Sequence, residues 1–422
     1  MVRFLHIADI HLGTNQYNSP DNIRKKDFFY SFKDIIEKYA LADKVDFVLI
    51  AGDLFDKSRI DPNTLNQALA VLKKLNDNNI PVFAIEGNHD SQISSDSVSW
   101  MQFLGEHKYI HFLKSELSDN KISFNDYNEN NLSYGCYKLN KNIRIIGVQW
   151  LGANTANAIP QIAKAIKALD DYPFTILMLH AGIEGYLAGY GTLSKSSLEP
   201  LKPYIDYLAL GHIHKHYIYD NWAYNPGSLE TCSIPEYFDP HGALIIEINN
   251  NTVTEVTLKT DYQKREFIRI NVDITNCPSS INALEKIKSI ITNYNKPFSN
   301  KPVIEVTIDG TLEFKRSELE LDKIKQYTTD RFNALLVMIK YFARPKEYAI
   351  GANLSEISNR KKVESTVIRD MLAQYSSFKE NDTVVNTLLT IKDMVLNADN
   401  NEKIFDYLKS NVTPVDKNNE DS

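Results

Sequence analysis

The chain has few cysteines, no long apolar run and no excess of positive charge. Its 422 residues include three cysteines, Cys136, Cys232 and Cys277, which lie far apart and form no C-x-x-C pair. This spacing is typical of a reducing compartment and excludes a disulfide scaffold and a zinc cluster of thiolates. No run reaches the roughly 18 apolar residues of a membrane span, and nothing near Met1 resembles a signal peptide. We therefore expect a cytoplasmic protein that does not enter a membrane.

Acidic residues outnumber basic ones. The 54 Asp and Glu residues exceed the 47 Lys and Arg residues, which gives a formal net charge of −7. Residues 1–250 hold 22 basic and 29 acidic residues, whereas residues 251–400 hold 22 and 20. Proteins that hold nucleic acid by overall basicity usually carry a clear Lys and Arg excess. That class is excluded, and any nucleic-acid role must come from a local site.

The length allows two or three domains, and the first covers residues 1–260. Short apolar runs alternate there with amphipathic segments, a pattern that predicts a layered α/β domain. We expect strands at residues 3–8, 46–51, 81–85, 143–149, 174–179, 207–210, 242–248 and 252–258. We expect helices at residues 24–42, 62–76 and 158–169. Residues 94–142 are rich in Ser and Asn and should form an insertion or a set of loops.

A polar hinge near residues 260–265 precedes a second unit. We expect a small α/β domain at residues 265–343, with strands at 267–274, 303–308 and 334–341 and helices at 279–294 and 317–331. The pattern then becomes helical only, over residues 346–412, with helices at 355–375, 383–396 and 403–408. The polar residues 413–422 should form a disordered tail.

Five short polar motifs follow directly on the expected apolar strands. They are Asp9-Ile10-His11, Gly52-Asp53, Gly87-Asn88-His89-Asp90, His180 and Gly211-His212-Ile213-His214. Because the carboxyl ends of strands in an open α/β sheet converge on one crevice, these side chains should share a pocket. Each motif alone is more typical of an ordinary turn or a hydrogen-bonded core histidine. Their order and their common placement at strand ends favour a metal site.

The donor types in these motifs indicate the metal. Carboxylate, amide and imidazole groups suit manganese, iron or zinc, and the absence of thiolates argues against a soft-metal or iron–sulfur site. Seven donors exceed one tetrahedral site, so we expect two metals about 3.5 to 4 Å apart. These donors are Asp9, His11, Asp53, Asn88, His180, His212 and His214. Asp53, which Gly52 holds in a tight turn, is the best candidate for a bridging carboxylate.

In this order the motifs resemble the calcineurin-like metallophosphoesterase superfamily, whose pattern is Asp-x-His, Gly-Asp, Gly-Asn-His-Asp/Glu, His, Gly-His-x-His. Residues 6–13 (HIADIHLG), 52–56 (GDLFD) and 224–230 (YNPGSLE) resemble one branch, the SbcD-type DNA double-strand-break repair nucleases. The resemblance implies an α/β/β/α metallophosphoesterase sandwich with a small α/β capping domain and a helical C-terminal segment. The motifs span residues 9–230, and the likeness is weak after Pro345.

The resemblance also implies roles for the motif residues. One metal would bind Asp9, His11, Asp53 and His214, and the other Asp53, Asn88, His180 and His212. His89 would stabilise the transition state or protonate the leaving oxygen, with Asp90 orienting it. The alternative for His89 is a hydrogen-bonded structural imidazole. The implied reaction is phosphodiester hydrolysis by two metal ions without a covalent enzyme intermediate.

One position departs from the family pattern. Asp56, followed by Lys57, stands where many family members have a histidine after Gly-Asp-Leu-Phe. The second imidazole that those members carry near the phosphate is therefore missing.

DNA affinity requires local Lys and Arg residues that contact phosphates. The candidates nearest to the motifs are Lys57, Arg59 and Lys215. Weaker candidates are Arg24, Lys25, Lys26, Lys264 and Arg265. A solvated surface charge is the alternative for each of them. Tyr17, Tyr186 and Tyr190 would either stack on bases or pack within the protein.

The apolar positions of the C-terminal helices have two explanations. They are Val363, Val367, Ile368, Met371, Leu372, Val384, Val385, Leu388, Leu389 and Ile391. One explanation is packing within a small helical domain. The other, which the resemblance implies, is binding to the coiled coil of an SbcC-type ATPase.

We therefore expect a manganese-dependent DNA phosphodiesterase, an exonuclease and endonuclease of double-strand-break repair. It would act with an SMC-like ATPase, as a homodimer within a heterotetramer. The alternatives are a phosphodiesterase for nucleotides or other small phosphodiesters, and a scaffold whose metal site has decayed. Two divalent cations would place four positive charges in the acidic N-terminal part, so its net charge does not exclude a metal-centred nuclease.

Overall fold

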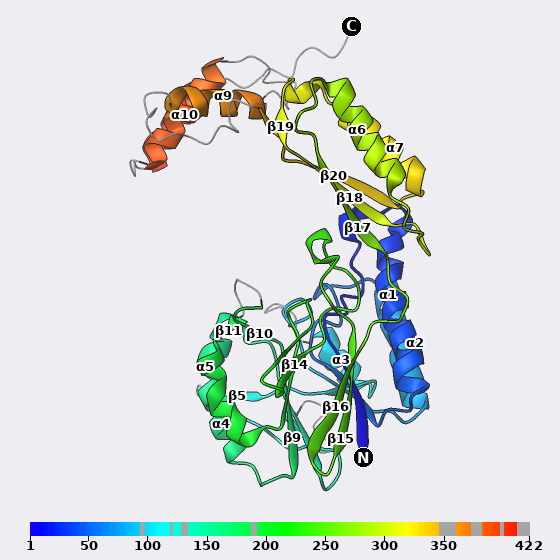
Figure 1. Cartoon of the computed structure of the whole chain (residues 1–422). Coiled ribbons are helices and arrows are strands. Elements are labelled where there is room, and N and C mark those ends of the chain that lie inside the picture. Colours follow the sequence, from blue (N-terminus) through cyan, green and yellow to red (C-terminus); the bar gives the residue numbers. More distant parts are fainter. Residues whose placement is uncertain are drawn as a thin grey trace. The chain divides into compact units, whose positions relative to one another are not determined.

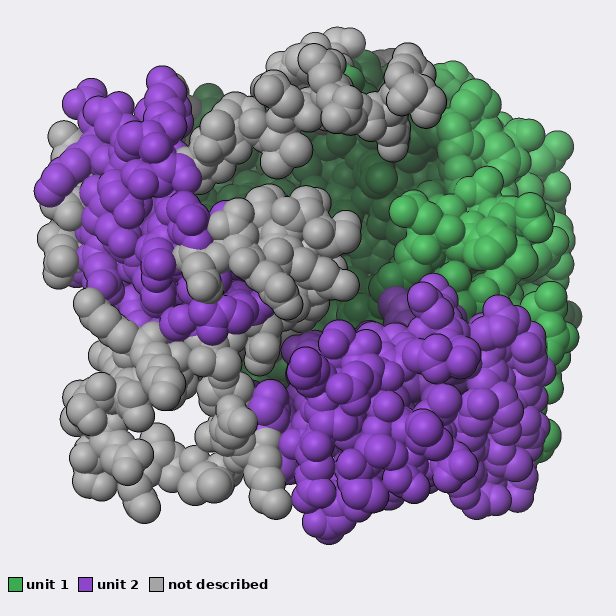
Figure 2. Space-filling view, turned by 90° about the horizontal axis from the view of Figure 1, so that it is seen from above, with its two compact units in different colours: residues 1–269, 297–305, 332–336 green, residues 270–296, 306–331, 337–422 purple. Residues whose placement is uncertain are grey.

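The computed structural model describes residues 1–92, 98–118, 121–127, 134–186, 192–345, 360–372, 382–396 and 401–411. The chain divides into two compact units, which Figure 2 distinguishes by colour. Unit 1 comprises Met1–Arg269, Pro297–Glu305 and Phe332–Leu336, and unit 2 comprises Ile270–Lys296, Val306–Arg331 and Val337–Ser422. The domain bounds expected from the sequence stay predictions. Residues 346–359 and the expected tail at 413–422 lie outside the described residues.

The first sheet of unit 1 is mixed and has six strands. They are β1 (Val2–Ile7), β2 (Phe47–Ile50), β3 (Val82–Ala84), β4 (His111–Phe112), β15 (Ala243–Asn249) and β16 (Thr252–Lys259). The order is β16-β15-β1-β2-β3-β4. β1 to β4 run parallel, and β15 and β16 add an antiparallel pair beside β1. The carboxyl ends of β1, β2 and β3 therefore lie at the same edge.

The second sheet of unit 1 is also mixed and has six strands. They are β7 (Cys136–Lys138), β8 (Ile143–Val148), β9 (Phe174–Leu179), β12 (Tyr207–Leu210), β13 (Tyr217–Tyr219) and β14 (Ala223–Asn225). The order is β13-β14-β12-β9-β8-β7. β8, β9, β12 and β14 are parallel, and β7 and β13 are antiparallel to their neighbours. Two small pairs complete unit 1: β5 (Glu116–Ser118) with β6 (Lys121–Ser123), and β10 (Gly182–Ile183) with β11 (Thr192–Leu193).

Helices cover the outer faces of the two sheets (Figure 1). Those packed on the first sheet are α1 (Ile23–Ile35), which continues as a π-helix over Ile36–Leu41, α2 (Pro62–Asp77) and α3 (Trp100–Glu106). Those on the second sheet are α4 (Thr155–Lys167) and α5 (Lys195–Leu198). Helix α2 begins as its sequence predicts, because the Asp61 carboxylate accepts a hydrogen bond from the Thr64 N–H and Pro62 occupies the first turn.

The two sheets pack against each other through a buried core. Phe4 and Phe47 of the first sheet lie in this core with Phe174 and Tyr207 of the second. Successive side chains of β1 alternate between faces, since Leu5 belongs instead to the core under α1 and α2. Both faces of β1 are therefore buried, which explains its continuous apolar sequence.

Residues 94–142 are more ordered than the sequence pattern indicates. Within the described part of this segment, α3 packs on the first sheet and β4 extends that sheet beyond β3. Ser99 caps α3, because its hydroxyl accepts a hydrogen bond from the Gln102 N–H. Of the two expectations, an insertion or a set of loops, the second does not describe these elements, because a seven-residue helix and a two-residue strand are too short to show periodicity in the sequence.

Strands and helices also alternate after residue 265. The strands β17 (Phe267–Asp273), β18 (Val303–Asp309) and β20 (Leu336–Tyr341) form a three-stranded sheet, and β19 (Thr311–Leu312) pairs with β21 (Arg344–Pro345). The helices are α6 (Ser280–Asn293), α7 (Leu321–Phe332), α9 (Arg360–Leu372), α10 (Asp382–Leu396) and α11 (Asn401–Asn411). No helix in the described ranges is long and apolar enough to cross a membrane.

His6 on β1 joins the two sheets of unit 1. Its Nδ1 lies 2.9 Å from the Tyr207 hydroxyl and its Nε2 lies 3.1 Å from the Leu210 carbonyl oxygen. The ring is fully buried, and burial lowers the pKa of His6 to about 3. His6 is thus a neutral core histidine with both ring nitrogens hydrogen-bonded.

This burial makes the stability of the protein depend on pH. The folded protein keeps His6 neutral down to about pH 3, whereas the unfolded chain protonates it below its ordinary pKa of 6.5. Between those values the unfolded state binds more protons, so the free energy of unfolding falls as the pH falls, by up to about 1.4 kcal/mol per pH unit for this group. We expect His6→Gln to reduce that slope in denaturant titrations between pH 6.5 and 4.5. The exposed His107, changed to Gln, serves as the control, and an unchanged slope in His6→Gln would contradict the assignment.

Candidate metal centre

The seven side chains predicted as metal ligands come together in one group. Asp9 and His11 follow β1, Asp53 follows β2 and Asn88 follows β3, all in the first sheet. The second sheet supplies His180 after β9, and His212 and His214 after β12. Each of the seven contacts at least one other through polar atoms 4.0 Å or less apart. The strand-end argument therefore places them correctly, while their role as ligands stays a prediction.

The loops that carry these residues have an unusual backbone. Asp9, His11, Asp53 and His212 have φ angles of 50°, 50°, 53° and 81°. Residues other than glycine rarely adopt positive φ, and each such residue costs on the order of 1–3 kcal/mol. Hydrogen bonds offset part of this conformational cost. The backbone N–H of His212 donates to both oxygens of the Asp9 carboxylate, at 3.1 and 3.0 Å. Four of the seven predicted ligands therefore have a positive φ.

Glycines allow the loops to approach closely. A Cβ added to Gly87 would lie 2.1 Å from Asp53 Oδ1, and one added to Gly52 would lie 2.3 Å from His180 Nδ1. Gly52 also has a φ of +92°, which larger residues rarely adopt. Any side chain at these positions would displace a predicted ligand.

One half of the centre contains Asp53, Asn88, His180 and His212. The Nε2 of His180 lies 3.2 Å from Asp53 Oδ2 and 3.1 Å from Asn88 Oδ1. His212 Nδ1 lies 2.9 Å from the same Asn88 oxygen. On its other side, His180 Nδ1 donates a hydrogen bond to the Ala51 carbonyl oxygen, at 2.8 Å. When His180 is neutral, this bond places its ring proton on Nδ1, which leaves the Nε2 lone pair available to a metal.

The other half contains His11 and His214. Their Nε2 atoms face each other at 3.2 Å, and His11 Nε2 lies 3.9 Å from Asp53 Oδ2. Asp53 thus lies between the two halves, as expected of a bridging carboxylate. Oxygen and imidazole donors in this number fit a pair of hard or borderline divalent cations.

The charges of the buried groups depend on one another. Burial raises the pKa of Asp9 to about 6. Burial would also raise the pKa of Asp53, but the adjacent His180 imidazole overcomes it and holds this pKa well below its usual value. Since protons and divalent cations compete for the same atoms, metal binding at such a centre weakens in acid.

Asp90 organises the backbone of two loops. Its buried carboxylate accepts hydrogen bonds from the N–H groups of Gly87 and Leu54, both at 2.8 Å, and of Phe55 at 3.3 Å. Burial, together with the charge of Asp53, raises the pKa of Asp90 to about 7. Asp90 therefore ties the loop after β3 to the loop after β2.

The ring of His89 has a different partner from the one expected. The ring Nδ1 lies 2.8 Å from the backbone carbonyl oxygen of Asp56. The backbone N–H of His89 donates a hydrogen bond to Asp53 Oδ1 at 2.8 Å. The expectation that Asp90 orients His89 therefore finds no support in these contacts. His89 is exposed at the edge of the centre, where a substrate can reach it.

Four further residues lie at the centre, and the sequence motifs did not indicate three of them. Asp56 Oδ1 lies 3.7 Å from His11 Nδ1, and Glu236 Oε1 lies 3.2 Å from His214 Nδ1. Cys232 Sγ and the ligand atoms of His11 and His214 lie within 4.8 Å of one another, so one thiol that the motifs do not include lies close to the predicted ligands. The Trp150 ring centroid lies 5.1 Å from that of His212. Only Asp56, as a departure from the family pattern, was noticed beforehand.

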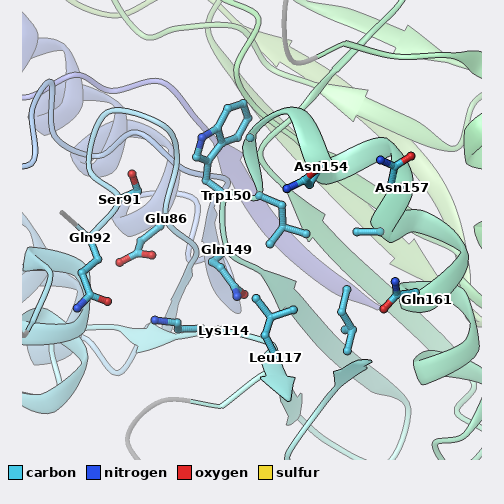
Figure 3. A pocket seen from close by; sticks show the side chains of 14 residues that line it. Glu86, Ser91, Gln92, Lys114, Leu117, Gln149, Trp150, Asn154, Asn157 and Gln161 are labelled. Carbon is cyan, nitrogen blue, oxygen red and sulfur yellow. The ribbon is translucent and has the colours of Figure 1, made fainter. Parts of the chain in front are cut away.

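Trp150 also borders a cavity of about 1300 Å³ (Figure 3). Figure 3 shows Glu86 and Gln92 on one side of this cavity and Asn157 and Gln161 on the other. Its wall is rich in side-chain amides. A wide recess, lined by both polar and apolar side chains, therefore lies beside the candidate metal centre, within unit 1.

The candidate phosphate contacts differ in their surroundings. Lys57 and Arg59 are exposed on the chain that follows Asp53. Lys215, next to His214, forms an ion pair with Asp239 at 2.9 Å. All three are near predicted ligands in the sequence, and their contact with DNA stays a prediction.

Arg24, by contrast, is not a surface charge. It is fully buried, and its guanidinium lies 2.8 Å from Asp27 and 3.6 Å from Glu230. Arg265 pairs with the same Asp27 carboxylate. The hypothesis that Arg24 contacts DNA is therefore wrong, and Glu230 of the Pro-Gly-Ser-Leu-Glu stretch is part of a buried ion cluster. Arg265 is only partly buried, so a DNA contact of this residue stays a prediction.

The tyrosines are only partly available for stacking on bases. Tyr186 already stacks on Tyr217, with ring centroids 4.0 Å apart. The Tyr17 hydroxyl accepts a hydrogen bond from the Ile234 N–H. Tyr190 lies outside the described residues.

Comparisons with known proteins agree with these features. The sequence profile of the calcineurin-like phosphoesterase family matches residues 2–216, just over half of the chain. The chain is 28% identical over 414 residues to a DNA double-strand break repair protein Mre11 of Methanocaldococcus jannaschii, covering 96% of this chain and 97% of that one. It is 26% identical to the protein of the same name from Saccharolobus solfataricus, covering 97% and 98%. The Archaeoglobus fulgidus protein of that name is 52% identical over 89 residues, which are 21% of this chain and 19% of that one.

The crowding at Gly87 yields a test of the centre. We expect Gly87→Ala to reduce Mn²⁺ uptake at least tenfold, because the added methyl group would displace the Asp53 carboxylate. Metal content after dialysis, measured by atomic spectroscopy, gives the result. Gly185→Ala is the control, since nothing lies within 4 Å of the added Cβ. Unlike Gly87, Gly185 has a positive φ, so any backbone strain from alanine falls on the control. Equal metal content in the two variants would show that Asp53 is not a ligand.

Proposed function

Since the chain belongs to the calcineurin-like phosphoesterase family, we propose that it is a metal-dependent DNA nuclease of double-strand-break repair. The observation that carries this proposal is the convergence of seven carboxylate, amide and imidazole side chains at the strand ends of unit 1. Two divalent cations held there would supply positive charge to a phosphate and lower the pKa of a bound water. Among the cations that this donor set fits, we propose manganese, which the family resemblance implies.

The comparisons favour DNA over small phosphodiesters as the substrate. Relatives that are named for DNA double-strand break repair align over almost the whole chain, including the C-terminal part. The cavity beside Trp150 also offers more room than a small ester requires. We infer exonuclease and endonuclease activity, with a phosphodiesterase for nucleotides or other small phosphodiesters as the alternative.

The finer architecture supports the same proposal. We propose that the two mixed sheets with their outer helices form the α/β/β/α sandwich of the family. The three-stranded sheet with α6 and α7 would be the capping domain at residues 265–343. The three free cysteines agree with a reducing compartment such as the cytoplasm.

In this proposal the chain's own residues position the substrate. Lys57, Arg59 and Lys215 would contact backbone phosphates on either side of the centre. His89, exposed and held through Nδ1 by the Asp56 carbonyl, would turn its Nε2 toward the leaving oxygen. Such an imidazole supplies a proton or a hydrogen bond in the transition state.

The role of His89 gives the test of function. We expect His89→Asn to keep the Mn²⁺ content of the wild type while turnover on linear duplex DNA falls about 10²- to 10⁴-fold, because a proton donor is lost without a ligand. Nucleotide release with Mn²⁺ and metal content are measured on the same preparation. His107→Asn, an exposed histidine outside the centre, is the control.

The outcomes separate the competing functions. Metal loss equal to the activity loss would make His89 a ligand and refute its assigned role. Wild-type activity on bis-p-nitrophenyl phosphate without activity on linear duplex DNA would favour the small-ester alternative. A wild-type protein that takes up no divalent metal would instead be a scaffold.

We further propose that the C-terminal helices bind the coiled coil of an SbcC-type ATPase, in a heterotetramer with two copies of this chain. Several large apolar side chains on α9, α10 and α11 are exposed. They are Val367, Met371, Leu388, Val395, Leu396 and Phe405, with exposed fractions between 39 and 67%. Neighbouring exposed apolar residues of this kind are typical of a protein-binding surface.

This surface can be tested by charge substitution. We expect the double substitution Met371→Glu and Val395→Glu to abolish co-purification with the coiled-coil ATPase while basal nuclease activity persists, because charges oppose burial in an apolar interface. Ile281→Glu, at a 69% exposed apolar position on α6, is the matched control. Undiminished co-purification of the double variant would refute this interface.

A further inference from the structure

Two carboxylates outside the predicted ligand set face metal-site histidines. Asp56 lies near His11, and Glu236 lies near His214. Both approach the Nδ1 atom, on the side of the ring away from the point where the two imidazoles meet. The Nε2 atoms meet at 3.2 Å, so one metal of the proposed pair would bind at this point.

His11 requires a partner for its outer nitrogen. The side chain is 2% exposed, and Nδ1 has no hydrogen-bond partner in the structure. A buried N–H without an acceptor is unfavourable. The Asp56 carboxylate, with Oδ1 at 3.7 Å, is the acceptor in place. A hydrogen bond between them requires the two atoms to approach by about 0.5 Å.

The backbone holds Asp56 beside His11. The Asp56 N–H donates to the Leu12 carbonyl oxygen at 3.0 Å, and the Thr14 hydroxyl hydrogen-bonds to the Asp56 carboxylate. The Asp56 carbonyl oxygen in turn accepts the hydrogen bond from His89 Nδ1. One residue therefore contacts both a predicted ligand and the imidazole proposed to act on the leaving group.

Glu236 is held more firmly. Its Oε2 accepts hydrogen bonds from the N–H groups of Cys232 and Ser233, at 3.0 and 3.2 Å. The Ser233 hydroxyl donates to Oε1 at 2.8 Å. These contacts leave Oε1 pointing at His214 Nδ1, 3.2 Å away. The carboxylate is oriented before any metal binds.

We propose that Asp56 and Glu236 are positioning residues for the metal held between His11 and His214. Each carboxylate accepts the Nδ1 proton of its histidine, which keeps Nε2 unprotonated and directed at the metal. The inference rests on the metal centre of the proposed function. It also predicts that the two metal sites differ in their dependence on carboxylates. In the other half of the centre, His180 donates its Nδ1 proton to the neutral Ala51 carbonyl oxygen instead.

This difference between the two sites makes the inference testable with Mn²⁺ alone. Metal-free full-length protein is titrated with Mn²⁺, and free Mn²⁺ is followed by electron paramagnetic resonance. We expect the wild type to bind two Mn²⁺ ions. Asp56→Asn or Glu236→Gln should lower the affinity for one of the two ions 10- to 100-fold and leave the affinity for the other unchanged. The spectrum of the coupled ion pair should vanish when one site is empty. Asp56→Glu, which keeps the carboxylate, should recover part of the affinity.

Controls separate positioning from folding. Glu37→Gln removes an equally ion-paired carboxylate, which bonds to Lys33 at 2.8 Å, and should bind both ions normally. The melting temperature of the metal-free variants should equal that of the wild type. Cys232→Ser tests the other group near His214 and should leave both affinities intact.

Several outcomes would overturn the inference. Wild-type affinity for both ions in both variants would refute it. Loss of both ions together, or a lower melting temperature without metal, would show a structural role instead. Loss of Mn²⁺ affinity in Cys232→Ser but not in Glu236→Gln would show that the Cys232 thiol, and not the Glu236 carboxylate, positions His214. A wild-type protein that binds two ions but cleaves no DNA would refute the proposed substrate and leave this inference standing, whereas one that binds none would overturn both.

Discussion

The carbonyl oxygen of Asp53 accepts hydrogen bonds from the N–H groups of Ile10 and His11, at 2.9 and 3.0 Å. Its carboxylate accepts a third from the His89 N–H and contacts His180 of the second sheet. Four separate segments of chain thereby meet on one residue, and the geometry of the whole centre depends on it. Because Asp53 itself has a positive φ, these bonds also hold its backbone in an unfavourable conformation.

Close contacts and backbone hydrogen bonds restrict the loops of the centre. Gly52 and Gly87 have no room for a methyl group, and Asp90 fixes two loops through three backbone hydrogen bonds. The loops that carry these side chains follow strands that are buried on both faces. Such close-packed strands cannot shift to accommodate a change in the loops. The donor atoms are thus preorganised, which reduces the reorganisation that metal binding requires.

The sequence allowed the central residues to be predicted because each follows directly on an apolar strand, and strand ends in such sheets converge. Asp56, Cys232, Glu236 and Trp150 could not be linked to the centre in the same way. Glu236 reaches His214 only because a short turn after β14 brings the chain back, and no periodic pattern encodes that return. The metal-ligand roles, and the domain bounds, remain predictions.

Errors in the fold had a similar origin. Arg24 belongs to a basic run, Arg24-Lys25-Lys26, that is typical of a surface. In the structure it is buried beside Glu230, an acidic partner 206 positions away in the sequence, so no local pattern indicates its burial. Helix α3 and strand β4 were missed because elements of this length show no period. Long amphipathic helices such as α2 were predicted nearly to the residue, since local pattern and capping agree there.

The position of β1 in its sheet has a consequence for synthesis of the protein. β1 pairs on one side with β2 and on the other with β15, which ends at Asn249. The sheet cannot close, and His212 and His214 cannot reach the first three motifs, until more than half of the chain has been translated. Pairing over so long a separation is slow. A nascent chain therefore carries Asp9 and Asp53 without a complete centre until His212 and His214 have been made.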